Sequence, residues 1–276
     1  MKLYLKTKDY SVTGEKFDLR YDQSLDMLVT KPQPVNLDPY YKSNDYISHT
    51  DANTSLFDRV YQTVKKYSLA KKVRLINNYS MNSKTLLDVG AGTGDFLLAA
   101  EKKGQWDVSG VEPNHKARTR AQEKGIDLYS SLGALPVRNY DVITLWHVLE
   151  HLADLDNQIN KLLELLNPKG TLVIAVPNFK SHDAKHYKEY WAAYDVPRHL
   201  WHFSKTAIEK LFSPHGLKVI KVKPLIFDAF YVSMLSEKYK TGRQNYARAF
   251  MLGLLSNVKA WGSKEYSSQI YILKRK

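Results

Sequence analysis

The sequence predicts an α/β protein with a doubly wound, mostly parallel sheet of seven strands and a small N-terminal extension. From Lys84 onward, short apolar runs alternate with segments of helical periodicity, and a glycine-rich turn follows the first run. The first 50 residues differ, because they hold many Tyr and Asp and few long apolar runs. We therefore expect an extension over residues 1–54 and a main domain over residues 55–276, which includes a leading helix and a lid at 178–204.

The predicted elements follow in chain order. Residues 16–21 and 27–30 are expected to form the strands of a hairpin in the extension, and the extension is expected to act as an active-site cap. A helix over 55–77 follows, with apolar side chains on one face. The seven strands of the main sheet are expected at 85–89, 107–112, 126–129, 140–145, 171–176, 218–222 and 269–273. The helices between them are expected at 95–103, 116–124, 155–167 and 205–215.

Composition excludes several classes of protein. The 276 residues contain no cysteine, which rules out disulfide scaffolds, cysteine-ligated metals and cysteine nucleophiles. No apolar run is long enough for a membrane span, and the N-terminus lacks the apolar stretch of a secretory signal, so a cytoplasmic location is expected. The net charge is +13, and residues 201–276 hold 14 Lys and Arg against 4 Asp and Glu. This basic segment favours either a solvated surface or contact with phosphate groups.

The strongest chemical signal is the turn after the first main strand. Asp88 ends an apolar run, and Gly90, Gly92 and Gly94 follow in the spacing G-x-G-x-G. A dinucleotide loop has the spacing G-x-G-x-x-G, and its third glycine would be Asp95 here, an anion where a pyrophosphate would lie. A P-loop is excluded because no Gly-Lys-Ser/Thr follows. The turn therefore suits a ligand without phosphate, and Asp88 suits an ammonium group.

A second acidic residue ends the next strand. Glu112 lies 18 positions beyond Gly94, where a carboxylate can accept hydrogen bonds from both hydroxyls of a ribose. Together, the turn and the two acids suggest a nucleoside that carries an amino acid.

Residues 84–178 resemble the class I S-adenosylmethionine-dependent methyltransferases, and within them the broad group that contains the ubiquinone-biosynthesis O-methyltransferases. The resemblance rests on Leu87–Gly94, Gly110–Pro113, Tyr140–Ile143, His147–Leu152 and Leu166–Leu172. It implies a Rossmann-like methyltransferase fold and S-adenosylmethionine as cofactor. It says little about the acceptor.

The resemblance also implies roles for individual residues. The methionine moiety would lie among Asp88, Gly90, Ala91, Gly92 and Gly94, and Glu112 would hold the ribose. The adenine would lie beside Pro113, Ser131 and Leu132, while Trp146 and His147 would lie under the sulfonium. The chain departs from the family pattern after the third strand, where Ser131 stands in place of the usual acidic residue.

The segment His147-Val148-Leu149-Glu150-His151 also matches the inverted zinc-protease signature H-x-x-E-H. That signature requires one long helix carrying both histidines and a distant third ligand. Because the segment directly follows a strong strand, we expect no metal there. His147 is instead a candidate cofactor contact or catalytic base.

Two other segments carry candidate residues. In the lid, aromatic and imidazole groups gather around Pro197, so His199 and His202 are candidate bases, and Tyr194 and Arg198 are candidate contacts for an aromatic or anionic acceptor. An equally good interpretation is a packed lid whose histidines are satisfied internally. In the extension, Tyr41, Tyr46 and His49 are candidate acceptor contacts, or ordinary packing residues.

Three functional hypotheses follow. The first is a methyltransferase with a small-molecule acceptor. The second is a nucleic-acid methyltransferase that uses the basic C-terminal segment, which is disfavoured because no RNA-binding module or Asn-Pro-Pro-Tyr motif is present. The third is a cofactor-binding scaffold without turnover, which the intact glycine turn and its two acids argue against.

Overall fold

The computed structural model describes residues 1–41, 56–80 and 84–276. Their contacts divide them into two units. The first unit comprises described residues 1–41, 147–155 and 174–272, and the second comprises 56–80, 84–146, 156–173 and 273–276. Each unit is therefore assembled from distant parts of the chain.

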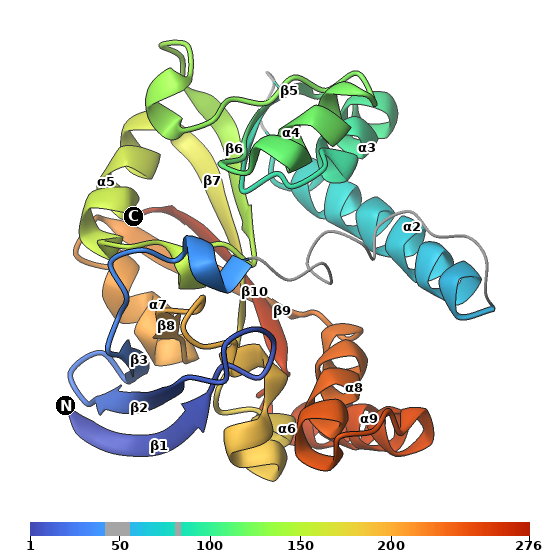
Figure 1. The fold of residues 1–276 in the computed structure, drawn as a ribbon. Helices are drawn as coiled ribbons and strands as arrows, with labels where there is room; N and C mark the ends of the chain where they lie inside the picture. Colours follow the sequence, from blue (N-terminus) through green and yellow to red (C-terminus); the bar gives the residue numbers. More distant parts are fainter. Residues whose placement is uncertain (42–55, 81–83) are drawn as a thin grey trace. The chain divides into compact units, whose positions relative to one another are not determined.

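The second unit begins with the leading helix α2 (Leu56–Asn77), as the sequence predicted. Strands β4 (Thr85–Val89), β5 (Asp107–Val111) and β6 (Tyr140–Trp146) form its parallel sheet, with β4 in the middle. Leu86 and Leu87 are fully buried although they point to opposite faces, as expected for a strand covered on both sides. The remaining helices of this unit are α3 (Asp95–Gly104), α4 (His115–Gln122), η2 (Leu132–Ala134) and most of α5 (Leu155–Leu165) (Figure 1).

The main sheet has six strands among the described residues, in the order β5-β4-β6-β7-β10-β9. The outer strands are β7 (Leu166–Pro177), β9 (Leu217–Pro224) and β10 (Ser268–Arg275). The expected seventh strand at 126–129 contributes only an isolated parallel bridge between Val111 and Tyr129. Ile126 in this segment is buried, so the segment packs into the unit without forming a regular strand. Strand β7 begins at Leu166, earlier than expected, so Pro168 and Gly170 lie within the strand and not at the end of a helix.

The first unit contains a separate four-stranded sheet in the order β1-β2-β3-β8 (Figure 1). Strands β2 (Lys16–Asp22) and β3 (Met27–Lys31) form the predicted antiparallel hairpin. Strand β1 (Lys2–Lys8) extends it on one side, and β8 (Trp201–His202) pairs with β3 on the other. The lid segment is thereby hydrogen-bonded to the N-terminal sheet.

The core of the first unit lies between this sheet and the lid. Phe17, Leu19 and Leu28 pack in one cluster with the lid aromatics Trp191 and Tyr194. The other elements of the unit are η1 (Asp38–Tyr41), η3 (Leu149–His151), α6 (His182–Tyr187), η4 (Lys188–Tyr190), η5 (Ala192–Tyr194), α7 (Lys205–Phe212), α8 (Asp228–Thr241) and α9 (Tyr246–Ser263). Ser204 caps α7 by accepting a hydrogen bond from the Ala207 amide at 3.0 Å, as its position predicted. Within the described ranges, no helix combines the length and the apolar composition that crossing a membrane requires.

Candidate functional site

The glycine turn joins β4 to α3 within the second unit. Gly90, Gly92 and Gly94 all have positive φ, at 72°, 54° and 74°. A Cβ on Gly94 would lie 3.1 Å from Ala121 Cβ, so that glycine is required for helix packing. A Cβ on Gly92 would meet nothing within 4 Å. Gly92 therefore leaves open space beside a backbone that only glycine adopts readily.

Asp88 lies at the end of β4, just before this turn. Its side chain is buried, and its Oδ1 accepts a hydrogen bond from Thr144 Oγ1 on β6 at 2.5 Å. Burial raises the pKa of Asp88 to about 7, although the Thr144 hydrogen bond and the Lys72 ammonium oppose the shift. A carboxylate in this setting gains stability when a cationic group binds beside it. This setting is compatible with the predicted ammonium contact.

Glu112 follows β5 and reaches back to the glycine turn. Its Oε2 accepts a hydrogen bond from the Gly92 amide at 2.9 Å, and its Oε1 accepts one from the Asn114 amide at 2.8 Å. Two backbone donors therefore hold the carboxylate in place while the side chain remains half-buried. Each oxygen keeps a further lone pair, so the group can still accept hydrogen bonds from a diol.

The other predicted cofactor residues of the second unit are more exposed. Pro113 and Ser131 are exposed, while Ala91, Leu132 and Trp146 are half-buried. The Lys72 ammonium lies 4.2 Å from the centroid of the Trp146 ring, and Phe96 meets the same ring edge to face. The region between Asp88 and Trp146 thus already accommodates a positive charge. Sequence reasoning missed Lys72 and Thr144, although Thr144 lies two positions before Trp146 on a strand that neighbours β4.

His147 lies in the first unit, directly after β6 in the chain. Its backbone has a positive φ of 57°, which is unusual for a residue other than glycine. Its Nε2 lies 2.9 Å from Asp228 Oδ2, and its Nδ1 lies 3.4 Å from Glu150 Oε1. Burial opposes protonation, but the Asp228 and Glu150 carboxylates raise the pKa of His147 to about 10. Since the side chain is 37% exposed, solvent weakens these pairs.

This arrangement disfavours His147 as a catalytic base, a role that stays a prediction. Both ring nitrogens face carboxylates, so the imidazole is protonated at neutral pH and has no free lone pair with which to take a proton. Asp228, at the start of α8, was missed because nothing in the local sequence links it to His147. A protonated His147 can still orient neighbouring groups or donate a hydrogen bond.

The other two candidate bases are buried. His202 is 4% exposed, its Nε2 lies 3.0 Å from Thr30 Oγ1, and burial holds its pKa well below the usual range. His199 is 9% exposed, and its Nδ1 lies 2.9 Å from the Ala193 carbonyl oxygen. The alternative interpretation of the lid, in which its histidines are satisfied internally, therefore describes His202 better than a catalytic role does.

The predicted acceptor contacts in the lid are also interior residues. Tyr194 and Arg198 are each 2% exposed. The Arg198 guanidinium binds Asp195 Oδ1 at 2.6 Å and Asp9 Oδ1 at 3.0 Å, and it donates to the Tyr40 carbonyl oxygen at 2.8 Å. Arg198 therefore joins the lid to the N-terminal segment. This structural role disfavours an acceptor contact at Arg198, which stays a prediction.

In the N-terminal segment, Tyr41 is half-buried and its hydroxyl lies 3.2 Å from His151 Nδ1. Tyr46 and His49 lie outside the described residues. Burial lowers the pKa of His151 to about 4, so this imidazole is neutral at physiological pH.

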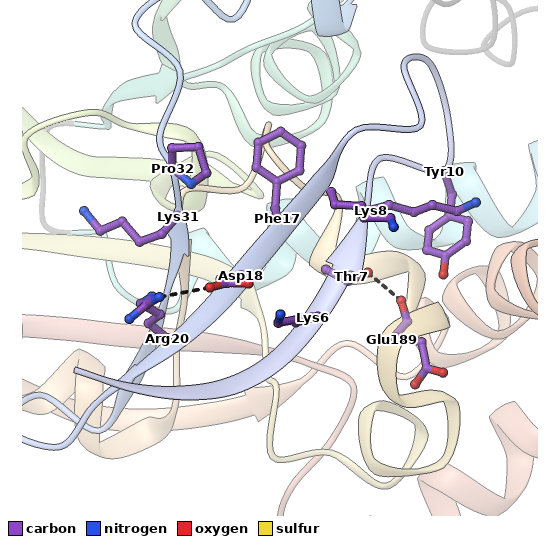
Figure 2. Close-up of a pocket in the computed structure, with 11 residues that line it drawn as sticks. Lys6, Thr7, Lys8, Tyr10, Phe17, Asp18, Arg20, Lys31, Pro32 and Glu189 are labelled. Carbon is purple, nitrogen blue, oxygen red and sulfur yellow. Dashed lines mark hydrogen bonds and ion pairs between the residues drawn. The ribbon is translucent and has the colours of Figure 1, made fainter.

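The first unit also has an open pocket of about 870 Å³ on its antiparallel sheet (Figure 2). Its lining includes the cationic side chains Lys6, Lys8, Lys16, Arg20 and Lys31, which favour anions. Asp18 offsets part of this charge through its ion pair with Arg20 at 3.0 Å. No residue of the glycine turn lines this pocket, so it is separate from the candidate cofactor site.

Comparison with known protein families identifies the domain that contains the glycine turn. A family model described as a methyltransferase domain matches residues 61–222, which is more than half of the chain. The chain belongs to this methyltransferase family. The matched residues form a domain of the class I methyltransferases, the class that uses S-adenosylmethionine as cofactor.

Curated relatives of this methyltransferase include a ubiquinone biosynthesis O-methyltransferase from Actinobacillus pleuropneumoniae serotype 7. The two are 33% identical over 109 residues, which cover 34% of this chain and 46% of the relative. The match thus spans less than half the length of the curated relatives.

Solved structures support the fold. The methyltransferase is similar to a cyclopropane synthase from Mycobacterium tuberculosis, with a TM-score of 0.54 and 15% identity over 85% of this chain and 95% of that chain. It is also similar to the magnesium protoporphyrin IX methyltransferase from Synechocystis PCC 6803 with bound SAH, with a TM-score of 0.54 and 14% identity over 83% and 91% of the two chains.

The open space beside Gly92 gives a testable prediction. We expect Gly92→Val to weaken cofactor binding at least about 10-fold, because a branched side chain would fill the space that the turn leaves for a ligand. Gly14→Val is the matched control, since Gly14 has a φ of 74° and equally open surroundings in the β1–β2 turn. Both variants carry similar backbone strain, so calorimetry should show weaker binding only for Gly92→Val. Equal affinities in the two variants would contradict the assignment of the turn.

Proposed function

We propose that this methyltransferase methylates a small molecule, and that the acceptor atom is an oxygen. An oxygen as the acceptor atom is supported by the names of the curated relatives, which are O-methyltransferases. The small-molecule acceptor is further supported by the structural neighbour named for magnesium protoporphyrin IX. The observation that carries the cofactor half of the proposal is the buried Asp88 carboxylate beside a glycine turn that is hydrogen-bonded to Glu112.

S-adenosylmethionine, when bound, supplies a methyl group activated by its sulfonium. Asp88 would bind the ammonium group of the amino acid portion, and Glu112 would accept hydrogen bonds from the ribose hydroxyls. Ala91, Gly90, Gly92 and Gly94 let the backbone approach the ligand, and Pro113, Ser131 and Leu132 line the adenine side. Trp146 offers an aromatic face to the positively charged centre.

The chain contributes to the reaction chiefly through positioning and exclusion of water. His147, held protonated between two carboxylates, is proposed to orient the acceptor and not to remove its proton. Tyr41, Tyr46 and His49 remain proposed acceptor contacts from the extension, whose boundary we place at residue 54.

The test is transfer of a labelled methyl group to a panel of phenols, hydroxy acids, carboxylates, amines and RNA. The proposal predicts label in a hydroxyl-bearing small molecule and none in RNA. Label that appears only in RNA would support the nucleic-acid alternative and would overturn the proposed acceptor class.

A further inference from the structure

Three potential metal ligands meet inside the first unit. Glu150 and His151 end the short turn η3 that follows β6, and His199 comes from the lid. One ligand atom from each of the three lies within 4.8 Å of the others. The two imidazole rings are packed edge to face, with their centroids 4.5 Å apart.

Glu150 is a buried carboxylate without a hydrogen bond. Its side chain is 1% exposed, and neither Oε1 nor Oε2 has a hydrogen-bond partner. The ion pair with His147 Nδ1, at 3.4 Å, is too long to supply one. Buried carboxylates are normally satisfied by donors or by a metal ion, so this group requires an explanation.

The two histidines are oriented as metal ligands usually are. His151 Nδ1 lies 3.0 Å from the Arg198 carbonyl oxygen, and His199 Nδ1 lies 2.9 Å from the Ala193 carbonyl oxygen. A carbonyl oxygen can only accept, so each Nδ1 carries a hydrogen, and Nε2 is the nitrogen of each ring that can coordinate a metal ion. Backbone carbonyls fix the tautomer and ring orientation of metal-binding histidines in the same way.

We propose that Glu150, His151 and His199 form a binding site for a divalent transition-metal ion, such as Zn²⁺ or Co²⁺. Two imidazole nitrogens and one carboxylate suit these ions better than they suit Mg²⁺ or Ca²⁺. Asp195 Oδ2, 4.0 Å from His199 Nε2, adds negative charge beside the site.

This ligand set differs from the zinc-protease arrangement that the sequence argument excluded. That arrangement needs His147 and His151 on one long helix. Here His147 precedes the 3-10 turn η3 and faces Asp228, while His151 ends that turn. The lid supplies the third ligand through His199. A bound ion would tie η3 to the lid.

The experiment uses the full chain, free of any affinity tag and stripped of metal with a chelator. Titration with Co²⁺ should give one equivalent bound and a visible d–d absorption band that Zn²⁺ abolishes. Zn²⁺ should also raise the Tm. Glu150→Gln and His199→Gln should each weaken Co²⁺ binding about 100-fold or more, because each removes a ligand and keeps the side-chain size.

His182→Gln is the matched control. His182 and His186 are both half-buried on α6, with their ring centroids 6.4 Å apart, so they are a second place where two histidines could bind a metal ion adventitiously. The control should bind Co²⁺ as the natural chain does. Asp88→Asn should lose affinity for S-adenosylmethionine but keep Co²⁺, while Glu150→Gln should do the reverse, so failure of one site is distinguishable from failure of the other.

Circular dichroism of each variant establishes that it is folded before its affinity is compared, and His199→Gln serves if Glu150→Gln does not fold. Absence of saturable binding at millimolar free Co²⁺ would overturn the proposal. Binding that survives in both ligand variants, or that is lost in His182→Gln, would overturn it equally.

Discussion

Asp88→Asn is expected to weaken S-adenosylmethionine binding about 10- to 100-fold and to stabilise the folded chain above pH 7. The asparagine keeps an oxygen to accept the Thr144 hydrogen bond but cannot pair with an ammonium group. Because the carboxylate is buried, its charge destabilises the protein when no cation is bound. Calorimetry measures the affinity, and urea unfolding measures the stability.

The same residue makes both quantities depend on pH. Its folded pKa, about 7, lies above the ordinary value of 3.8, so the folded chain holds a proton that the unfolded chain releases between these values. Its contribution to stability therefore falls by about 1.4 kcal/mol per pH unit as the pH rises through this window, and it is constant above it. Cofactor affinity should move the other way and rise about 10-fold between pH 6 and pH 8, because the ionised form binds the ammonium group.

Asp107→Asn is the control for Asp88→Asn. It removes one negative charge from the same sheet, but the Asp107 side chain is 61% exposed. Neither the affinity nor its pH dependence should change in this control. If Asp88→Asn bound the cofactor as tightly as the natural chain, the proposed ammonium contact would be wrong.

Arg198→Met is expected to destabilise the protein by about 3–5 kcal/mol, because it leaves the Asp9 and Asp195 carboxylates without their cation. The pKa of Asp9 is now lowered to about 2, since its hydrogen bonds and ion pair with Arg198 outweigh its burial. That interaction stabilises the fold above about pH 4 and is lost as the pH falls toward 2. The variant should therefore also lose the acid sensitivity that Asp9 confers, as urea unfolding across this range would show.

Arg20→Met provides the matched control for this substitution. Arg20 pairs with Asp18 on the surface, and its side chain is 43% exposed, so we expect a loss below about 1 kcal/mol. The competing view treats Arg198 as a contact for an anionic acceptor. A variant of undiminished stability with a raised KM would establish that view in place of the structural role.

Local sequence signals predicted the elements around the cofactor site well. The apolar run at 85–89, the positive-φ glycines and the cap at Ser204 each act through neighbouring residues, so they can be recognised without the fold. The expected strand at 126–129 is only a bridge at Tyr129, because so short an apolar run does not by itself establish strand pairing. Helices α8 and α9 were missed, and with them the partner of His147.

Within the candidate site, sequence patterns indicate only those residues whose positions are set by the turn and by the order of the strands. Asp88 and Glu112 flank a turn, and their positions follow from the order of the strands. Arg198 and His202 are both buried, which residue type alone does not indicate, because burial depends on which distant segments pack together. The pairing of β8 with β3 and the contact of Arg198 with Asp9 join residues more than 150 positions apart in the chain, and no local pattern indicates either.

The central claim is that the turn after β4 accommodates the adenosyl amino acid of S-adenosylmethionine and not a nucleotide phosphate. Isothermal titration of the full chain with the demethylated cofactor tests it most directly, with NAD and ATP titrated in parallel. The account predicts one saturable site for the demethylated cofactor, weakened by Gly92→Val, and no binding of NAD or ATP. Saturable binding of NAD or ATP that Gly92→Val weakens, with none for the demethylated cofactor, would contradict it.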